Sequence, residues 1–269
     1  MKNLLIGAIS TNYNVSDIEN WVNSAKKVLT EDDEIYILLY NFKSGNVLVP
    51  YLESKGINVL VMDFDLHGSH IDQFETNTGL MTSSTAYKLV HNIRFLHIWR
   101  MLLEISYNEV LITDVKDVIL NKRPFGRFEG EEFIVASSEV IKYQDHDWNK
   151  DHIQETFGLA SLDLLNQDVN NVGVVLGKGE AIKHLCLDIY LNALNKTKVA
   201  DQTAFNYLIN NSYKSKTLRT NLSDKWAVHL HVVNEGRVSF DLNTLKDYTI
   251  IHQYDRLGNE IQHYYTIPQ

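Results

Sequence analysis

The chain has 269 residues, of which 44% are hydrophobic and 22% charged, which is compatible with one large domain or two small ones. Its formal net charge of −9, without any block of Lys and Arg, argues against a nucleic-acid partner. A lone cysteine, Cys186, excludes an internal disulfide framework, and no apolar run has membrane-spanning length. We therefore expect a soluble cytoplasmic protein. Because no stretch rich in Pro, Gly and Ser divides it, we favour a single domain.

The first half of the chain alternates strand and helix signals. Short apolar runs predict buried strands at residues 4–10, 34–42, 57–64 and 109–113. Apolar residues at helical spacing predict helices at residues 16–29, 47–56 and 84–106. Ser16 and Glu19 form a capping-box pattern, and Gly56 follows the second helix. This alternation indicates βαβ units, and therefore an α/β fold with a mostly parallel central sheet flanked by helices.

The second half is less regular. Apolar runs predict strands at 132–140 and 171–179 and a late strand with its exit at 247–256. Residues 200–210 are predicted to form a helix, and the spacing around Cys186 is helical, with the thiol as a small buried side chain. The charged, aromatic segment 143–158 is interpreted as a loop with a short helix. The polar loop at 65–83 is long enough to suggest a functional role.

Residues 110–117 read VLITDVKD, so two aspartates, Asp114 and Asp117, follow a buried strand. Ligands of parallel α/β sheets bind at the carboxyl ends of the strands. Paired carboxylates are ligands that a hard divalent cation prefers, and such a cation can bridge the phosphates of a nucleotide. Taken alone, the pattern is explained equally well by a solvated polar turn.

Four stretches, in order, resemble segments of nucleotide-sugar glycosyltransferases with the glycosyltransferase A fold. EVLITDVKDVILNKRPF, with its Pro124, resembles the metal-binding segment of that family. NNVGVVLGKGEAIKHL (170–185) resembles the Asn-x-Gly strand and following helix of the acceptor side. DQTAFNYLI (201–209) resembles the Asp-Gln helix start, and IIHQYDR (250–256) the C-terminal strand whose His often completes the metal site.

The resemblance implies one glycosyltransferase domain over 1–269, with a donor half at 1–125 and an acceptor half at 126–269. It implies metal-dependent transfer of a sugar from a UDP- or GDP-sugar to a hydroxyl of a glycan or other acceptor. The implied cofactor is Mn²⁺ or Mg²⁺.

The implied metal ligands are Asp114, Asp117 and His252. This chain departs from the family pattern Asp-x-Asp, because Lys116 stands in the second aspartate's place. We expect Asp117 to be the closer ligand and Asp114 to contact metal, water or ribose. A literal Asp-x-Asp at residues 63–65 is the alternative metal centre, although it lacks the preceding long helix and the following Pro.

The expected donor-binding residues, on the same resemblance, are Thr11, Tyr13, Arg94, Arg100, Asp114 and Lys116. Arg94 and Arg100 lie on the helix before the motif, and Arg100 falls on its apolar stripe, so either could hold the diphosphate or an aspartate of the motif. Thr11 and Tyr13 follow the first strand, where they could equally cap the next helix.

The candidates for a catalytic carboxylate are Asp201 and Asp168, since an inverting transferase needs a general base near the acceptor hydroxyl. Asp201 could instead be a charge that stabilises a helix N-terminus, and Asp168 a plain loop residue.

Two other function classes stay open. A sugar nucleotidyltransferase shares the fold and metal needs, but the first strand's exit, GAISTNYN, lacks the Gly-rich basic loop of those enzymes. A glycosyltransferase-like protein that binds a sugar or partner without turnover is kept open by Lys116. A lysine can also partly replace a cation against phosphate, so metal-independent transfer is a further variant.

Overall fold

The computed structural model describes residues 1–10, 12–40, 46–62, 83–194 and 199–257, with the backbone alone for 83–89. Thr11, the 63–65 alternative and the predicted loop up to residue 82 lie outside the described residues.

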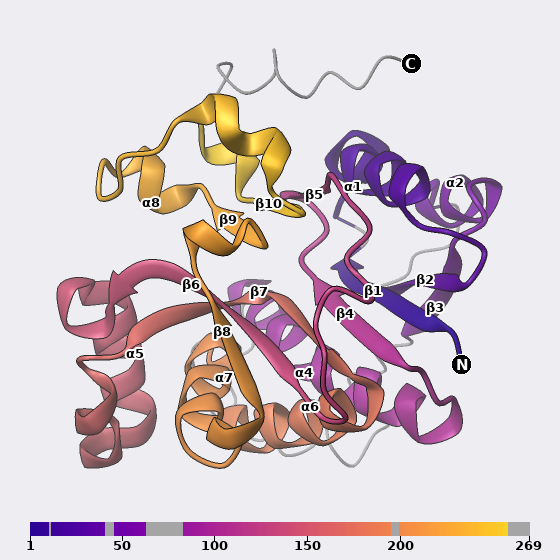
Figure 1. Cartoon of the computed structure of the whole chain (residues 1–269). Coiled ribbons are helices and arrows are strands. Elements are labelled where there is room, and N and C mark those ends of the chain that lie inside the picture. Colours follow the sequence, from indigo (N-terminus) through magenta and orange to yellow (C-terminus); the bar gives the residue numbers. More distant parts are fainter. Residues whose placement is uncertain (11, 41–45, 63–82, 195–198, 258–269) are drawn as a thin grey trace.

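The central element is a seven-stranded sheet with the order β3-β2-β1-β4-β7-β6-β8 (Figure 1). Its strands are β1 (Asn3–Ser10), β2 (Asp33–Tyr40), β3 (Asn58–Met62), β4 (Glu109–Thr113), β6 (Ile134–Lys142), β7 (Asp168–Lys178) and β8 (Thr217–Thr220). β7 runs antiparallel to both its neighbours, β4 and β6, whereas the other pairs are parallel. The prediction of a mostly parallel sheet is confirmed, and β4–β7 pairing joins the strands of the two predicted halves in one sheet.

A second, three-stranded sheet has the order β5-β10-β9, with β5 (Val118–Leu120), β9 (Ala227–His229) and β10 (Ile250–His252). β10 pairs antiparallel with β5, which places His252 opposite Val118. Asp117 directly precedes Val118 in the chain, so this pairing brings the carboxyl end of β4 next to a histidine from the far end of the sequence.

Helices lie on both faces of the large sheet, at one end of it and beside the small sheet (Figure 1). They are α1 (Val15–Val28), α2 (Leu48–Ser54), α4 (Ser83–Glu104), α5 (Asp147–Phe157), α6 (Gly179–Ala193), α7 (Asp201–Asn210) and α8 (His231–Asn234). Short 3₁₀ helices are η1 (Tyr143–Asp145), η2 (Gly158–Leu164), η3 (Lys214–Lys216), η4 (Leu222–Asp224), η5 (Leu242–Asp247) and η6 (Tyr254–Leu257). None of the helices in the described residues has both the length and the apolar character needed to cross a membrane.

The start of α1 corrects one expectation. The N-cap is Asn14 and its capping-box partner is Asp17, whose carboxylate accepts from the Asn14 backbone N–H at 2.9 Å. The pair predicted from sequence was Ser16 and Glu19. Asn and Asp cap as well as Ser does, so several spacings in this segment compete and backbone geometry decides between them.

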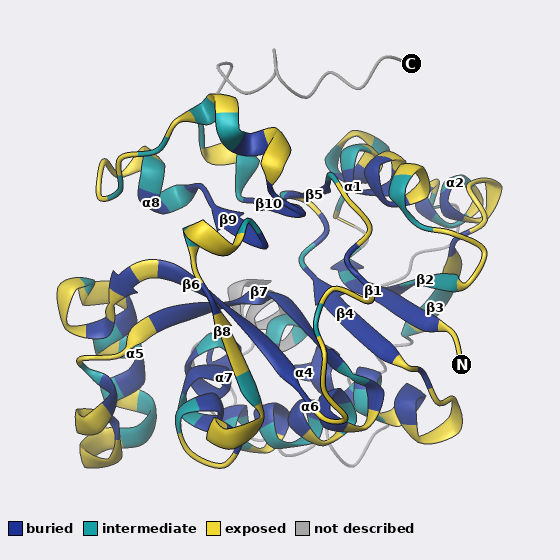
Figure 2. Cartoon of the chain, in the orientation of Figure 1, coloured by how far each residue is buried: buried dark blue, intermediate teal, exposed yellow. Residues whose placement is uncertain are grey.

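The strands of the large sheet divide the core into two layers. On β1, Leu4 and Ile6 pack with α4, α6 and α7, whereas Leu5 and Ile9 pack with α1 and α2. All five residues of β4 are buried, as expected for a strand covered on both faces (Figure 2). The polar residues that follow β4 are therefore held at the end of a rigid, fully packed strand.

A buried hydrogen bond from α1 holds the end of β4 in place. The indole Nε1 of Trp21 on α1 donates to the Thr113 hydroxyl at 2.9 Å, and both side chains have no exposed surface. We expect Thr113→Val, which keeps the shape and removes the acceptor, to lower the free energy of unfolding by about 1–3 kcal/mol, because the indole N–H is left unpaired. Urea denaturation measures this. Thr217→Val is the control, since the half-buried Thr217 hydroxyl donates to the Tyr213 carbonyl, where water can replace it. Equal losses in the two variants would contradict the assignment.

Candidate active site

A cavity of about 590 Å³ opens at the carboxyl ends of β1 and β4, between α4, β7, α7 and the segment that follows β10. Its size falls in the range of small-molecule sites. Asn12 and Tyr13 line it after β1, and Asp114, Lys116 and Asp117 line it after β4. This is the edge at which open α/β sheets bind their ligands.

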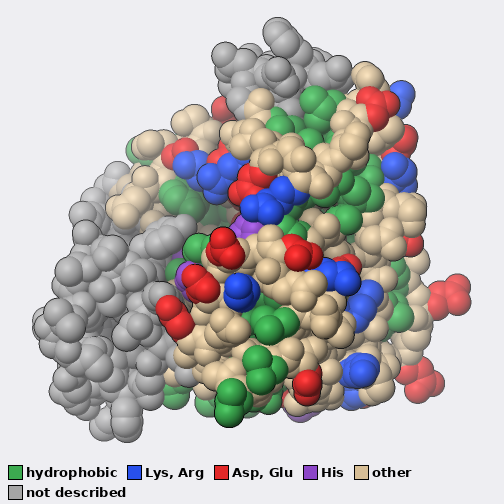
Figure 3. All heavy atoms as spheres, turned by 90° about the vertical axis from the view of Figure 1, so that its left-hand side faces the viewer, with side chains coloured by type: hydrophobic (Ala, Val, Ile, Leu, Met, Phe, Trp, Pro, Cys, Tyr) green, Lys and Arg blue, Asp and Glu red, His purple; other side chains and the backbone are tan. Residues whose placement is uncertain are grey.

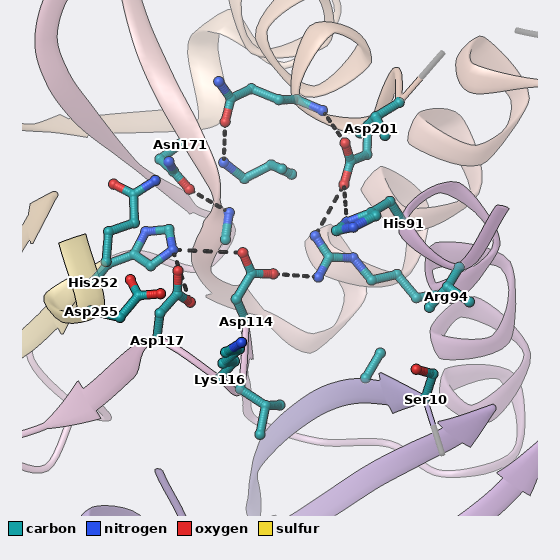
Figure 4. Close-up of a pocket in the computed structure, with 18 of the residues that line it drawn as sticks. Ser10, His91, Arg94, Asp114, Lys116, Asp117, Asn171, Asp201, His252 and Asp255 are labelled. Carbon is teal, nitrogen blue, oxygen red and sulfur yellow. Dashed lines mark hydrogen bonds and ion pairs between the residues drawn. The ribbon is translucent and has the colours of Figure 1, made fainter. Parts of the chain in front are cut away.

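Three side chains in this pocket form a group that could hold a metal ion. Asp114, Asp117 and His252 each offer one ligand atom, and these atoms all lie within 4.8 Å of one another. The Nε2 atom of His252 lies 3.6 Å from Asp114 Oδ2 and 3.5 Å from Asp117 Oδ1 (Figure 4). Two carboxylate oxygens and one imidazole nitrogen are a donor set that suits Mn²⁺ and is acceptable for Mg²⁺.

Backbone contacts hold this group in position. The Asp114 N–H donates to the Gly173 carbonyl at 2.9 Å, and the Gln253 N–H donates to the Asp117 carbonyl at 2.7 Å. A Cβ atom on Gly173 would lie 2.5 Å from Asp114 Oδ2 and 2.7 Å from His252 Cε1. Only glycine therefore leaves room for both side chains. The Asn-x-Gly pattern of β7 is explained by this contact, because Asn171 Oδ1 also accepts from the Gly173 N–H at 2.7 Å.

The charges of the group are strongly coupled. Burial by itself would lower the pKa of His252, but Asp117 and Asp114 outweigh it and raise this pKa to about 10. Burial would raise the pKa of Asp114, but Arg94 and His252 hold it well below its usual range. In its protonated form the imidazole therefore places one positive charge between the two carboxylates. A metal ion would take over that role from the proton.

A second histidine orients the first. His229 is buried on β9, and its Nδ1 lies 3.0 Å from Nδ1 of His252. This contact occupies one nitrogen of His252 and leaves Nε2 to face the two aspartates. Burial lowers the pKa of His229 well below its usual value, so it stays neutral. Such a partner behind a ligand histidine fixes the ring and its tautomer.

Arg94 on α4 joins two carboxylates across the pocket floor. It donates from Nη1 to Asp114 Oδ1 at 2.6 Å and from Nη2 to Asp201 Oδ2 at 3.1 Å (Figure 4). Burial would lower the pKa of Arg94, but Asp114 and Asp201 raise it. The sequence left open whether this arginine holds the diphosphate or an aspartate of the motif, and in the structure it contacts the aspartate Asp114.

Arg100 does not lie on the buried face of α4. Its side chain is exposed, and it is not among the described residues that line the pocket. The buried face of this part of the helix runs through Phe95, Ile98, Met101 and Leu102. Residues 92–96 are all buried, so the helix is covered on every side around Ile93, whereas after residue 98 only one side is covered and Arg100 lies on the other.

The two candidate bases differ in position. Asp201 is buried and lines the pocket, but its carboxylate is held by Arg94 and by the Gln202 N–H at 2.8 Å. Asp168 is exposed at the start of β7, accepts from the Ser138 hydroxyl at 3.0 Å, and is not among the described lining residues.

Tyr13 and Lys116, both predicted to bind the donor, line the pocket. Sequence reasoning left out several other lining residues, and His91, Asn171 and Gln202 are three of them. Two of them stand in motifs that were recognised, the Asn-x-Gly strand and the Asp-Gln helix start. His91 lies three residues before Arg94 on one helix face, which is the signal that was missed.

Solved structures of other proteins share the fold of this chain. The apo-form glycosyltransferase GlyE of Streptococcus pneumoniae TIGR4 matches with a TM-score of 0.52 and 16% identity, over 94% of this chain and 54% of the GlyE chain. Our chain thus spans about half the length of GlyE. The galactosyltransferase LgtC, solved with donor and acceptor sugar analogs, matches with a TM-score of 0.50 and 14% identity, over 98% of this chain and 96% of that chain.

The chain has the glycosyltransferase A fold. An active-site mutant of LgtC also matches, with a TM-score of 0.51 and 15% identity, over 93% of this chain and 87% of that one. At these identities the shared property is the fold. No protein-family model and no curated protein sequence matches the chain.

Arg94 bridges two parts of the fold through Asp114 and Asp201, whereas Arg100 is exposed. We expect Arg94→Met to lower the free energy of unfolding by about 3–5 kcal/mol, because it leaves two carboxylates at the pocket floor without their shared cation. Arg100→Met, the same change on the exposed side of the helix, is expected to stay within about 0.5 kcal/mol. Urea denaturation followed by tryptophan fluorescence measures both. Similar losses in the two variants would contradict the bridging role.

Gly173→Ala tests the metal group without touching a ligand. The added methyl forces Asp114 or His252 to move, so we expect Mn²⁺ affinity to fall about tenfold or more while the circular dichroism spectrum is retained. The electron paramagnetic resonance signal of free Mn²⁺ measures the affinity. Val172→Ala, one residue away and also at the pocket, is the control. Unchanged Mn²⁺ binding in Gly173→Ala would count against this site.

Proposed function

We propose that this protein is a metal-dependent glycosyltransferase that moves a hexose or related sugar from a nucleotide diphosphate donor to an acceptor hydroxyl. The observation that carries the proposal is the group of Asp114, Asp117 and His252 at the end of β4, inside a pocket of ligand size. The glycosyltransferase A fold supports it, since that fold places nucleotide-sugar donors at this sheet edge in the family that the sequence resembles.

Each of the three proposed ligands keeps one atom that can bind a cation. Asp114 uses Oδ1 for Arg94 and keeps Oδ2 for the metal. Asp117 has no such cationic partner besides His252 among the described residues, so we assign it as the direct ligand. When bound, Mn²⁺ or Mg²⁺ supplies positive charge against the departing diphosphate.

Lys116 is the residue best suited to reach the donor's phosphates. Its side chain is half exposed at the pocket, and its nearest carboxylate, on Asp17, lies 3.7 Å away. A surface ion pair of this length is weak, so the ammonium is available to a phosphate. Tyr13 and Thr11 are proposed for the nucleoside, which we expect to be uridine or guanosine.

Arg94 and Asp201 act as positioning residues in this proposal. Asp201 has its carboxylate satisfied by Arg94 and by backbone, so we assign it to orienting Arg94 and Asp114 rather than to taking a proton. Asp168 is not among the described residues that line the pocket. Arg100 is not retained as a donor contact.

The position of Lys116 also favours a second candidate, a metal-independent site in which the ammonium replaces the cation. No feature of the described part of this pocket specifically favours a nucleotidyltransferase or a binding protein without turnover.

Calorimetric titration of UDP and GDP, each with Mn²⁺ or EDTA, tests the proposal. We expect binding of one nucleotide to the wild type with Mn²⁺, and loss of binding with EDTA or in Asp117→Asn. Asp255→Asn is the matched control, because Asp255 lines the same pocket outside the metal group. Binding that survives both EDTA and Asp117→Asn would favour the Lys116 site. No binding of either nucleotide would overturn a UDP- or GDP-sugar donor.

A further inference from the structure

One large aromatic side chain at the pocket is not accounted for by donor or metal binding. Of the four tryptophans, Trp21 and Trp226 are fully buried and Trp99 is partly buried in the core. Trp148, the second residue of α5, is 49% exposed and lines the pocket. Figure 3 faces the side of the molecule that carries α5, where hydrophobic side chains lie among charges of both signs. An exposed indole leaves a large apolar surface in water, which a ligand can cover.

The indole is held in one orientation. The imidazole of His152, one helical turn later, stacks on it with ring centroids 3.9 Å apart and planes inclined by 28°. The Nδ1 atom of His152 in turn contacts the Trp148 carbonyl oxygen at 2.7 Å. One indole face is thus covered within the helix, while about half of the residue's surface stays exposed and the residue lines the cavity. A surface fixed in this way loses little entropy when a ligand stacks on it.

The start of α5 is also fastened to the pocket wall. Asn149, next to Trp148, is buried and accepts from Gln202 Nε2 at 3.0 Å. Gln202 is adjacent to Asp201, which binds Arg94, which binds the metal group through Asp114. This series of contacts fixes the position of Trp148 relative to the place where the donor's phosphates are proposed to bind.

The position of Trp148 separates it from the donor residues. α5 follows β6, on the β7–β6 side of the sheet, whereas Tyr13 and Lys116 follow β1 and β4. A sugar ring has one apolar face of C–H groups and a rim of hydroxyls, and its C–H groups carry slight positive charge. The face of an aromatic ring is apolar and slightly negative, so the two surfaces complement each other.

We infer that Trp148 is the platform on which a saccharide acceptor stacks, with its reactive hydroxyl directed toward the metal group. The inference rests on the proposed function and narrows the acceptor class to glycans with an accessible sugar ring. A nucleotide base could also stack on an indole, and the test below separates the two ligands.

The test is saturation-transfer difference NMR with the methyl glycosides of glucose, galactose and mannose. It uses the whole chain with UDP or GDP and with Mg²⁺, because Mn²⁺ would broaden the signals. We expect the wild type to bind at least one glycoside and Trp148→Ala to bind it about tenfold more weakly. Trp148→Phe, which keeps an aromatic face, is expected to recover most of the affinity. Leu162→Ala is the control, since Leu162 is similarly exposed, at 51%, and is not among the described lining residues.

The nucleotide titrations on the same variants keep the two proposals distinguishable. Unchanged UDP or GDP affinity in Trp148→Ala supports a saccharide platform. Weaker nucleotide binding with unchanged glycoside binding would overturn it in favour of base stacking. Equal glycoside affinity in wild type and Trp148→Ala, or no glycoside binding to the wild type, would also overturn it while leaving the donor site standing. Loss of nucleotide binding from the wild type would instead remove the proposed function.

Discussion

The bridge from Arg94 to Asp114 and Asp201 is the contact on which the geometry of the pocket depends. A guanidinium that is almost fully buried loses its hydration, and only well-placed carboxylates offset that loss. Here the two carboxylates come from the end of β4 and the start of α7, and the arginine comes from α4. Three elements that are distant in the sequence are therefore held at fixed separations. Asp114 of the metal group is attached to this bridge directly, and Gln202, next to Asp201, connects it to Asn149 at the start of α5.

The small sheet supplies the third member of the metal group, His252. The large sheet alone places Asp114 and Asp117 at its edge, but it supplies no third ligand. Pairing of β5 with β10 brings His252 to the same point, and Gly173 on β7 leaves space where any side chain would collide. His229 on β9 then fixes the imidazole. All three strands of the small sheet are thus connected to this group, because β10 carries His252, β9 carries His229 and β5 directly follows Asp117.

The sequence predicted the parts of this arrangement that rest on local patterns. β4 was predicted with its observed bounds, and Asp114, Asp117 and His252 do lie together. β5, β8 and β9 were not predicted, because strands of three or four residues are too short to show a period. The reversed direction of β7 and the exposure of Arg100 depend on which neighbours each element meets. Trp148 stood in a segment recognised only as charged and aromatic, since its exposure is set by tertiary packing.

The charges of the pocket give a physical reason for a metal in an acidic protein. Among the described residues that line it, four carboxylates (Asp114, Asp117, Asp201 and Asp255) face three permanent cations (Arg94, Lys116 and Arg256). Arg94 is already committed to two of those carboxylates, which leaves Lys116 and Arg256 as the permanent cations that could meet a nucleotide diphosphate. A divalent cation held by Asp114, Asp117 and His252 would replace the single positive charge of the protonated imidazole with two, so the pocket would attract the phosphates of the proposed donor more strongly. The departure from Asp-x-Asp acts in the same direction, because Lys116 adds a positive charge at the point where the family pattern has a negative one.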